Sequence, residues 1–567
     1  MLSRKLVCVM RNTVLCATAI FSLTMLCIGQ EDRPFYYYGD QKIYLTPSTS
    51  TVAAKIQPSL STTYQTKYTT LSNYFRALDP SGSRPDLRIL VSKNDASSTK
   101  ATAALSTGLE AKEIFKVPVY KIGKITLVVQ NEMIVQFKPD TTENTREALL
   151  KKFSNNYRHI DGTPEKYLVT LGNPESTLRV SNTLHDNHSV EYAQPNFLSI
   201  VAPIEGTHWN APDVPENSPG PLDASPGNVS VAPSDPLFRR QWNLDNHFGN
   251  AQDGKASADI SIIKAWNKTM GSDQIRVAVL DEGVDINHPD LVNSFAMQDG
   301  KVVQWDAILE SDSQQPAATE SHGTRVAGVI AATANNHIGI AGVAPGVRII
   351  PIRMGSREDS ADGVWTTPLI VDQAIRKAIQ LGADVINASW QMSKADVVDG
   401  AIQYAATKGR NGKGTVVVCA AGNDGGPVVY PAQLASKFPI IAVGATNSWD
   451  DVKTRDSKDK ETFWASNMGS ELTVVAPGVG IVTTTNHSVG GDSNNDYVYD
   501  FDGTSSAAPQ VAGVAALVLS VHPDWTAARV REHIANTATK LGTGQHSDQW
   551  GFGRVNACRA VEALNCN

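Results

Sequence analysis

The second half of the chain alternates short apolar runs with longer stretches in which apolar positions recur every three or four residues. The runs are dominated by Val, Ile, Leu and Ala, which is typical of strands buried on both faces, and the stretches between them have helical periodicity. Strands are expected at 275–280, 347–352, 383–387, 415–420 and 440–443, and helices at 323–333, 367–381, 395–408, 505–521 and 526–538. This alternation predicts an α/β fold, a doubly wound parallel sheet covered on both faces, with ligands at the carboxyl ends of its strands.

A smaller pattern precedes this domain. Over residues 119–201 the sequence predicts a two-layer α+β sandwich, with strands at 125–137, 167–171 and 190–193 and helices at 143–153 and 177–184. Residues 35–118, rich in Thr and Ser, are expected to form another small α+β unit of unknown role. Lys55-Ile56-Gln57-Pro58 has a counterpart in Gln136-Phe137-Lys138-Pro139, which suggests that the first unit is a degenerate copy of the second.

Two further segments stand out by composition. Residues 203–233 hold seven Pro and three Gly, which indicates an extended linker over 202–233 and leaves 234–567 as the last domain. Residues 1–29 contain Arg4, Lys5 and Arg11, followed by an apolar stretch of about fifteen residues, shorter than the ~20 that a membrane span needs. A secretory signal peptide is therefore expected, with no membrane span after its removal and a secreted or extracytoplasmic location.

Charge and cysteine content narrow the picture. The chain carries 50 Lys and Arg against 57 Asp and Glu, a net charge of -7, so no overall basic field favours nucleic acid as a partner. Three of the six cysteines lie in the expected signal peptide. Of the others, Cys558 and Cys566 are close enough in sequence to pair in an oxidising compartment, whereas Cys419 lies in an apolar run and is expected to be an inert buried thiol.

Three polar residues lie where the fold places chemistry. Asp281 ends an expected strand, and His322 and Ser505 each open an expected helix. Each alone has a structural explanation as a turn former or a helix cap. Together they supply a hydroxyl nucleophile, an imidazole base to take its proton, and a carboxylate to orient the imidazole. Asn423, at the end of another strand, supplies an amide donor for a developing oxyanion, with the backbone N–H of Ser505 as the second donor.

In these motifs the chain resembles the subtilisin-like serine proteases, or subtilases. The likeness rests on Asp281-Glu282-Gly283 with His288-Pro289-Asp290-Leu291, His322-Gly323-Thr324, Ala421-Gly422-Asn423 and Gly503-Thr504-Ser505, in that order. The resemblance implies a subtilisin-like endopeptidase domain over 234–567, made as an inactive precursor. It also implies that residues 119–201 are a ferredoxin-like propeptide, which acts as an intramolecular inhibitor.

The same resemblance implies a structural calcium ion. In subtilases, a loop after the histidine-bearing helix binds Ca²⁺ together with the Asp of His-Pro-Asp-Leu and an earlier Asp. Here the carboxylates would be Asp290 and Asp235, joined by the side chain of Asn336 and by the backbone carbonyls of Thr333, Ile338 and Ile340. Two carboxylates and four neutral oxygens make a reasonable shell for Ca²⁺.

Two alternatives to a general endopeptidase are open. One is a catalytically silent member that serves as a binding module, with residues 35–118 as its contact surface. The other is a precursor-processing convertase that cuts after basic residues, suggested in part by Ser389-Trp390. Against the convertase, Lys394 stands where an acid would be wanted, Val429 should make the pocket shallow and apolar, and no Lys or Arg occurs between Arg179 and Arg239. We expect protein or peptide substrates, cleavage after Ala, Val or Leu, and a monomer.

Overall fold

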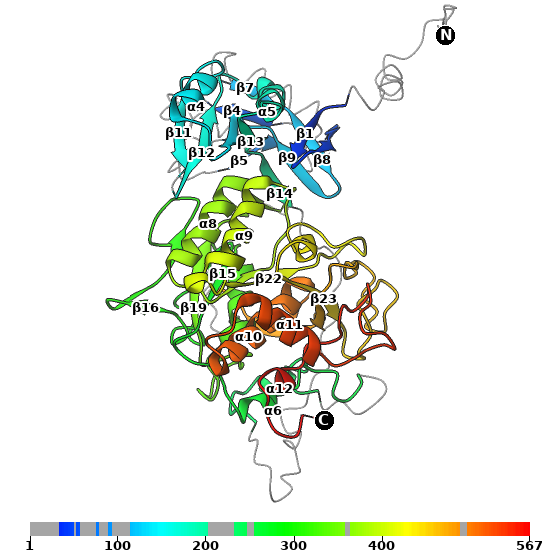
Figure 1. Ribbon diagram of the computed structural model, residues 1–567. Coiled ribbons are helices and arrows are strands. Elements are labelled where there is room, and N and C mark those ends of the chain that lie inside the picture. The colour runs from blue at the N-terminus through cyan, green and yellow to red at the C-terminus, as the bar shows by residue number, and fades with distance from the viewer. Residues whose placement is uncertain are drawn as a thin grey trace, which may run out of the picture.

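The computed structural model describes residues 33–49, 51, 53–56, 75–78, 89–92, 114–160, 162–201, 232–246, 254–357, 363–487 and 496–566. These residues form a smaller lobe, drawn in blue and cyan, and a larger lobe, drawn in green to red (Figure 1). The expected signal peptide and nearly all of the expected linker lie outside the described residues.

A seven-stranded, all-parallel sheet forms the centre of the larger lobe, in the order β18-β19-β15-β21-β22-β23-β24. Its strands are β15 (Arg276–Asp281), β18 (Trp305–Asp306), β19 (Arg348–Arg353), β21 (Val385–Ala388), β22 (Val416–Ala420), β23 (Ile441–Thr446) and β24 (Val474–Pro477). The five strands expected from the sequence are confirmed, each within three residues of its predicted bounds. β15 comes first in the chain yet lies inside the sheet, so the connections run to both sides of it.

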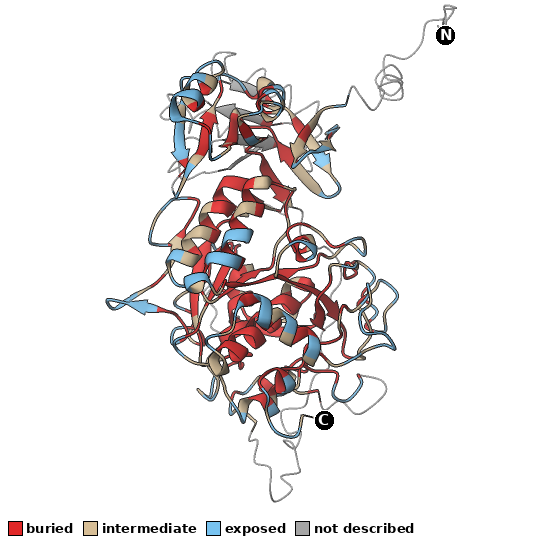
Figure 2. Cartoon of the chain, viewed as in Figure 1, coloured by how far each residue is buried: buried red, intermediate tan, exposed pale blue. Residues whose placement is uncertain are grey.

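Helices cover both faces of this sheet, as predicted (Figure 1). Side chains along β15 alternate: Val277 and Val279 pack in one core with α7 (His322–Ala331) and α10 (Thr504–Val521), while Ala278 and Leu280 pack in another with α8 (Pro368–Gln380) and α9 (Asp396–Lys408). Figure 2 shows the resulting buried centre of the lobe. α10 is long and apolar enough for a membrane span, but 83% of it is buried, which marks it as a core helix.

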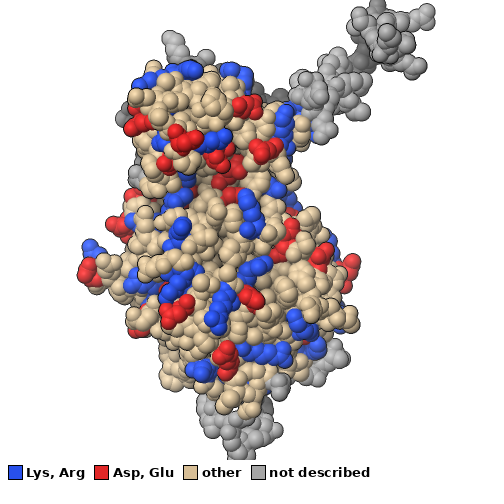
Figure 3. Space-filling view, in the orientation of Figure 1, with Lys and Arg blue, Asp and Glu red and all other residues tan. Residues whose placement is uncertain are grey.

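The remaining elements of the larger lobe are short. They are α6 (Ile262–Trp266), α11 (Ala527–Thr537), α12 (Ala557–Ala560), β16 (Met297–Gln298), β17 (Lys301–Val302), β20 (Val364–Thr366), β25 (Ile481–Thr484), β26 (Tyr497–Phe501) and the 3-10 helices η5 (Phe238–Arg240), η6 (Arg410–Gly412) and η7 (Ala432–Ser436). Cys558 and Cys566 form a disulfide at the C-terminal end, and Cys419 is a free thiol whose pKa burial raises to about 12. Charges of both signs are interspersed over the visible face (Figure 3).

The smaller lobe contains a four-stranded antiparallel sheet in the order β11-β12-β10-β13. Its elements are β10 (Glu132–Phe137), α4 (Glu143–Leu150), β11 (Tyr157–Ile160), β12 (Thr163–Thr170), η4 (Pro174–Ser176), α5 (Thr177–His185) and β13 (Val190–Pro195). One expectation is wrong: the strand predicted at 125–137 is two strands, β9 (Ile125–Val128) and β10. They separate at 129–131 because β9 belongs to a different sheet.

A second four-stranded sheet, β5-β6-β4-β7, is formed by β4 (Ala53–Ile56), β5 (Phe75–Leu78), β6 (Ile89–Ser92) and β7 (Ile114–Val117). Its first, second, third and fourth strands occupy the same places as β10, β11, β12 and β13, and all its pairs are antiparallel. The shared order agrees with the short sequence repeat. The two N-terminal units thus have the same sheet topology.

A five-stranded sheet in the order β20-β14-β9-β8-β3 joins the two lobes. It contains β3 (Thr46–Pro47), β8 (Val119–Ile122), β9, β14 (Leu198–Val201) and β20. β14, which follows the smaller lobe, is antiparallel to β20 of the larger lobe, with Ile200 opposite Trp365. Backbone hydrogen bonds therefore link the smaller lobe directly to an edge of the larger one.

Candidate active site

Asp281, the last residue of β15, is hydrogen-bonded to His322, the first residue of α7. The Nδ1 atom of His322 lies 2.9 and 3.0 Å from the two carboxylate oxygens of Asp281. The backbone N–H of Glu282 also donates to Asp281, at 2.8 Å, which holds the carboxylate in place. Gly323 allows this approach, since a Cβ there would lie 2.1 Å from the carbonyl oxygen of Gly283.

The environment of His322 favours a basic imidazole. Burial alone would lower its pKa, but the charge of Asp281 and the hydrogen bond that the imidazole donates to that carboxylate outweigh burial, so the pKa is raised above the ordinary value. Because Nδ1 is bonded to Asp281, Nε2 is the ring nitrogen that can accept a proton from another group. His322 is thus oriented and charge-stabilised as a general base requires.

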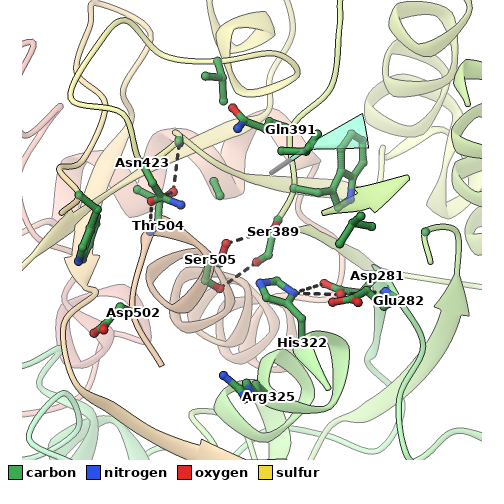
Figure 4. Close-up of a pocket in the computed structure, with 18 of the residues that line it drawn as sticks. Asp281, Glu282, His322, Arg325, Ser389, Gln391, Asn423, Asp502, Thr504 and Ser505 are labelled. Carbon is green, nitrogen blue, oxygen red and sulfur yellow. Dashed lines mark hydrogen bonds and ion pairs between the residues drawn. The ribbon is translucent and has the colours of Figure 1, made fainter. Parts of the chain in front are cut away.

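Ser505 lies in the first turn of α10, beside His322 in the cleft (Figure 4). Gly503, with φ of 106°, makes the sharp entry into the helix that a side chain would strain. The Ser505 hydroxyl donates to the carbonyl oxygen of Ser389 at 3.2 Å, and the Ser389 hydroxyl donates back to the carbonyl of Ser505 at 3.0 Å. In this conformation the hydroxyl of Ser505 is hydrogen-bonded to Ser389.

Asn423 follows β22 and is fixed by Thr504. Its Oδ1 accepts hydrogen bonds from the backbone N–H of Thr504 at 2.8 Å and from the Thr504 hydroxyl at 3.0 Å. Because the oxygen end of the amide is occupied, the Nδ2 end is left to donate toward the cleft. The sequence did not assign a role to Thr504, and its only signal was its place before Ser505.

These residues line a cleft of about 660 Å³. Gly422 and Val429 form one wall, and a Cβ at Gly422 would lie 2.9 Å from both methyl carbons of Val429, so Val429 narrows that side. Arg325, Asp500 and Asp502 line another part of the cleft. Lys394 does not line it, contrary to expectation, because its ammonium lies over the ring of Tyr38 at 5.3 Å.

The smaller lobe reaches into the same cleft. Val201, at the end of β14, lines it, as does Lys124, in the turn between β8 and β9. The Lys124 ammonium forms an ion pair of 2.5 Å with Asp424, the neighbour of Asn423. The cleft is therefore occupied along one edge by residues of the smaller lobe.

Three of the residues expected to bind calcium, Asp235, Asp290 and Asn336, lie together in one cluster. Asn336 donates from Nδ2 to Asp290 at 2.7 Å, and its backbone N–H donates to Asp235 at 3.1 Å. Burial raises the pKa of Asp290 to about 6, and the nearby charge of Asp235 adds to this effect. Two desolvated carboxylates side by side are stabilised by a cation.

The backbone carbonyls of the loop that follows α7 are also suited to bind a calcium ion. The carbonyl oxygens of Thr333, Ile338 and Ile340 accept no hydrogen bond from any residue that the structure describes. Gly339, with φ of 54°, lies between the last two. The residues present therefore fit a calcium ion, with carboxylates and free carbonyls as the oxygen donors that this ion prefers.

The carboxylate, imidazole, hydroxyl and amide around one cleft are the arrangement that serine proteases use. The subtilase family model matches residues 272–553, and a thermophilic serine proteinase from a Bacillus species is 33% identical over 76% of this chain and 88% of its own length. The chain belongs to the subtilase family and is a subtilisin-like serine endopeptidase.

Other relatives agree. Subtilisin E from Bacillus subtilis is 37% identical over 51% of this chain and 66% of its own length. A calcium-dependent protease from a Nostoc species is 33% identical over 57% of this chain, which spans about half of that relative, 51%. The solved structure of fervidolysin from Fervidobacterium pennivorans, a keratinolytic enzyme related to subtilisin, matches with a TM-score of 0.53 and 22% identity, over 78% of this chain and 62% of that chain. This last likeness concerns the fold.

Proposed function

We propose that the protein is a secreted serine endopeptidase that is made as a precursor and cuts itself. Ser505 is the nucleophile, His322 the general base, Asp281 the group that orients His322, and Asn423 the oxyanion donor. The observation that carries this assignment is the hydrogen bond between Asp281 and His322 at the cleft where Ser505 opens α10.

The reaction follows from these positions. Ser505 Oγ attacks the substrate carbonyl carbon while His322 Nε2 takes the hydroxyl proton, and Asp281 stabilises the resulting imidazolium. The negative charge on the carbonyl oxygen is met by Asn423 Nδ2 and the backbone N–H of Ser505. His322 then gives the proton to the leaving amine, and water releases the acyl group from Ser505 by the same steps.

Residues 119–201 are proposed to be the inhibitory propeptide, with a ferredoxin-like fold. The strand order of β10 to β13 and the two intervening helices support this fold. Inhibition is supported by β14, which ends at the cleft, and by contacts that cap two helices of the larger lobe. Asn196 accepts from the backbone N–H of Leu369 in α8, and Gln194 accepts from Val397 in α9.

A structural calcium ion is proposed at Asp235, Asp290 and Asn336, with the carbonyls of Thr333, Ile338 and Ile340. The fit of these oxygens supports it, as does the name of the calcium-dependent protease among the relatives. The ion would neutralise two buried carboxylates and tie the start of the peptidase domain to two of its loops. No catalytic step passes through it.

Processing and location complete the proposal. The signal peptide at 1–29, the propeptide and the linker at 202–233 would be removed from a monomeric peptidase domain at 234–567 that acts outside the cytoplasm. Protein and peptide substrates would be cut after small or medium apolar residues, since Val429 narrows the cleft beside Gly422. Cleavage after basic residues, as in a convertase, is the alternative that a peptide library distinguishes.

A fluorophosphonate probe tests the assignment. It should attach to Ser505 in the processed protein, as mass spectrometry of the labelled peptide shows, and Ser505→Ala should remove the label. Ser506→Ala, at the neighbouring buried serine, is the matched control and should keep it. A folded, processed protein that does not react would favour the catalytically silent binding module.

A further inference from the structure

A hairpin at the start of the described chain lies between the two lobes. It consists of β1 (Phe35–Tyr38) and β2 (Gln41–Tyr44), with Gly39 in the turn at φ of 50°. Successive side chains of a strand point to opposite sides, so the aromatic residues of β1 form two faces. We refer to residues 35–44 as the aromatic hairpin.

One face contacts the propeptide. The ring of Tyr37 stacks on the imidazole of His185 in α5, with centroids 4.1 Å apart. The side chain of Asn182, also in α5, donates to the carbonyl oxygen of Phe35 at 3.0 Å. This face fixes the hairpin to the smaller lobe.

The other face contacts the peptidase domain, although the ring of Tyr36 on this face also packs edge to face on Phe197 of the propeptide, with centroids 5.1 Å apart. The Tyr36 hydroxyl donates to the carbonyl oxygen of Lys394 at 3.0 Å, and only 1% of Tyr36 is exposed. The Tyr38 hydroxyl donates to Asp399 at 2.8 Å, and the backbone N–H of Gly39 donates to Asp396 at 2.8 Å. Three donors of the hairpin thus meet three acceptors at the start of α9.

The receiving surface is built around these acceptors. Asp399 also accepts from the hydroxyl of Tyr430 at 2.8 Å, and the ring of Tyr38 meets that of Tyr430 edge to face. The Lys394 ammonium lies over the Tyr38 ring. The residues of this contact do not line the catalytic cleft; they are Tyr36, Tyr38, Lys394, Asp399 and Tyr430. The contact lies outside the cleft and adjoins the one that β14 makes, since Ser199 of β14 and Ser393, the neighbour of Lys394, share a hydrogen bond.

We propose that the aromatic hairpin is a latch, a second docking element that holds the propeptide on the peptidase domain after the chain between them is cut. The proposal rests on the proposed role of residues 119–201 as inhibitor. The receiving surface around α9 recognises an extended segment with two tyrosines on one face and a tight turn that offers a free backbone N–H. The lifetime of the inhibited complex is then set by this contact as well as by the cleft.

The latch should respond to pH. Burial raises the pKa of Asp396 to about 7, from an ordinary value near 3.8. The docked carboxyl therefore keeps a proton at pH values where an exposed one has lost it, so protons favour docking. Docking should weaken as the pH rises toward 7, by at most about tenfold for each pH unit. The titratable and charged groups around Asp396 are Tyr36, Tyr38 and Asp40 of the hairpin, Tyr192 of the propeptide, and Asp399, Tyr430 and Lys437 of the peptidase domain.

The test uses the full chain with Ser505→Ala and a recognition site for a specific protease placed between residues 205 and 230. That protease makes the cut, so the measurement does not depend on self-processing. The cut protein is immobilised through a C-terminal tag, and the N-terminal part retained on the support is followed over time at pH 5.5 and pH 8. Thermal unfolding of each uncut variant checks that it is folded.

Tyr36→Phe with Tyr38→Phe should speed release about 10- to 100-fold at pH 5.5, since two buried hydrogen bonds are lost. Tyr37→Phe, on the opposite face of the same strand, keeps its ring on His185 and should release at the unchanged rate. Asp396→Asn, a neutral acceptor for Gly39, should release as slowly at pH 8 as the parent does at pH 5.5, which separates Asp396 from His185 as the titrating group.

Equal release rates for the parent and the double variant, with both folded, would overturn the latch. So would a Tyr37→Phe variant that releases as fast as the double variant, because the effect would then come from the propeptide alone. If the propeptide separates at once from every form, including the parent, the proposed inhibitor fails instead. Failure of self-processing in the active chain would leave these rates unaffected.

Discussion

The carbonyl oxygen of the Asn423 side chain accepts two hydrogen bonds from Thr504, one from its backbone N–H and one from its hydroxyl. The residue next to Ser505 therefore orients the side-chain amide of Asn423, which we propose as the oxyanion donor. The Thr504 hydroxyl also accepts from the backbone N–H of Gly422 at 3.0 Å, so it ties the segment after β22 to the start of α10.

Thr504→Val removes the hydroxyl and keeps the shape of the side chain. We expect kcat to fall about tenfold with KM nearly unchanged, the equivalent of one neutral hydrogen bond. Thr504→Ser keeps the hydroxyl and is the matched control.

Asn423→Ala should lower kcat by ~10²–10³, a magnitude taken from the same kind of substitution in subtilisin. Steady-state kinetics on a peptide substrate measures all three, and an unchanged kcat for Asn423→Ala would remove it from the oxyanion site.

Ser505→Ala should abolish both peptide hydrolysis and self-processing, because one hydroxyl serves both reactions. The expected product in a host without other proteases is the uncut precursor, seen by intact-mass measurement. Ser506→Ala, at the buried neighbour, should be cut as the parent is. Mature-sized Ser505→Ala protein would show that another enzyme makes the cut.

The acid limb of the activity profile reports on His322. The base must be neutral, so activity is lost as the pH falls through its pKa. The charge of Asp281 raises that pKa above the ordinary value, and the limb in kcat/KM should therefore lie above about pH 6.5. In Asp281→Asn the carboxylate charge is gone, so the residual activity should show its acid limb at lower pH. A limb that stays in place would mean that another group controls it.

Calcium removal should lower stability without removing a catalytic group. An ion that binds only the folded state at 100 times its Kd adds about 2.7 kcal/mol to the free energy of unfolding. A chelator should therefore lower Tm, and Asp290→Ala should lower it similarly and make it insensitive to the chelator. Asp312→Ala, at an exposed acid, is the control and should respond to the chelator as the parent does. A Tm that ignores both treatments contradicts the ligand assignment.

Val429→Gly should widen the cleft beside Gly422 and shift preference from small apolar residues toward Phe and Tyr on the acyl side of the cut. The two methyl carbons of Val429 border the position that a side chain at Gly422 would take, so their loss opens that wall. A peptide library gives the profile for parent and variant. A parent profile dominated by Arg or Lys would favour the convertase alternative.

The central sheet and the placement of Asp281, His322 and Ser505 around one cleft were predictable because their signals are local and strong. Continuous apolar runs such as 415–420 mark buried strands, and Asp281, His322 and Ser505 lie at the ends of such elements. Short strands gave no comparable signal. β18 has only two residues, and the division of 125–137 into β9 and β10 depends on pairing with distant strands rather than on local pattern.

The site details beyond the triad depend on long-range contacts. Thr504 reaches Asn423 across 81 positions in sequence, and no periodicity connects them. Lys394 was expected in the cleft because it follows Ser389-Trp390. The chain turns toward α9 before it reaches Lys394. The ammonium of Lys394 therefore lies over the ring of Tyr38, which is more than 350 positions earlier in the sequence. Contacts of this kind follow from the assembled fold, which the sequence pattern constrains only weakly.

Departure of β14 takes away the strand that pairs with β20, so the main-chain donors and acceptors of β20 on that side become open to an extended chain. A foreign polypeptide that takes this place is held through its backbone, which is the same for every sequence. Contacts along β20 then add no preference for sequence, and such preference is left to the wall that Gly422 and Val429 form. Where a target protein is cut should accordingly depend on which of its stretches can be drawn out into a strand, so loosely structured regions would be consumed first and well-packed domains spared.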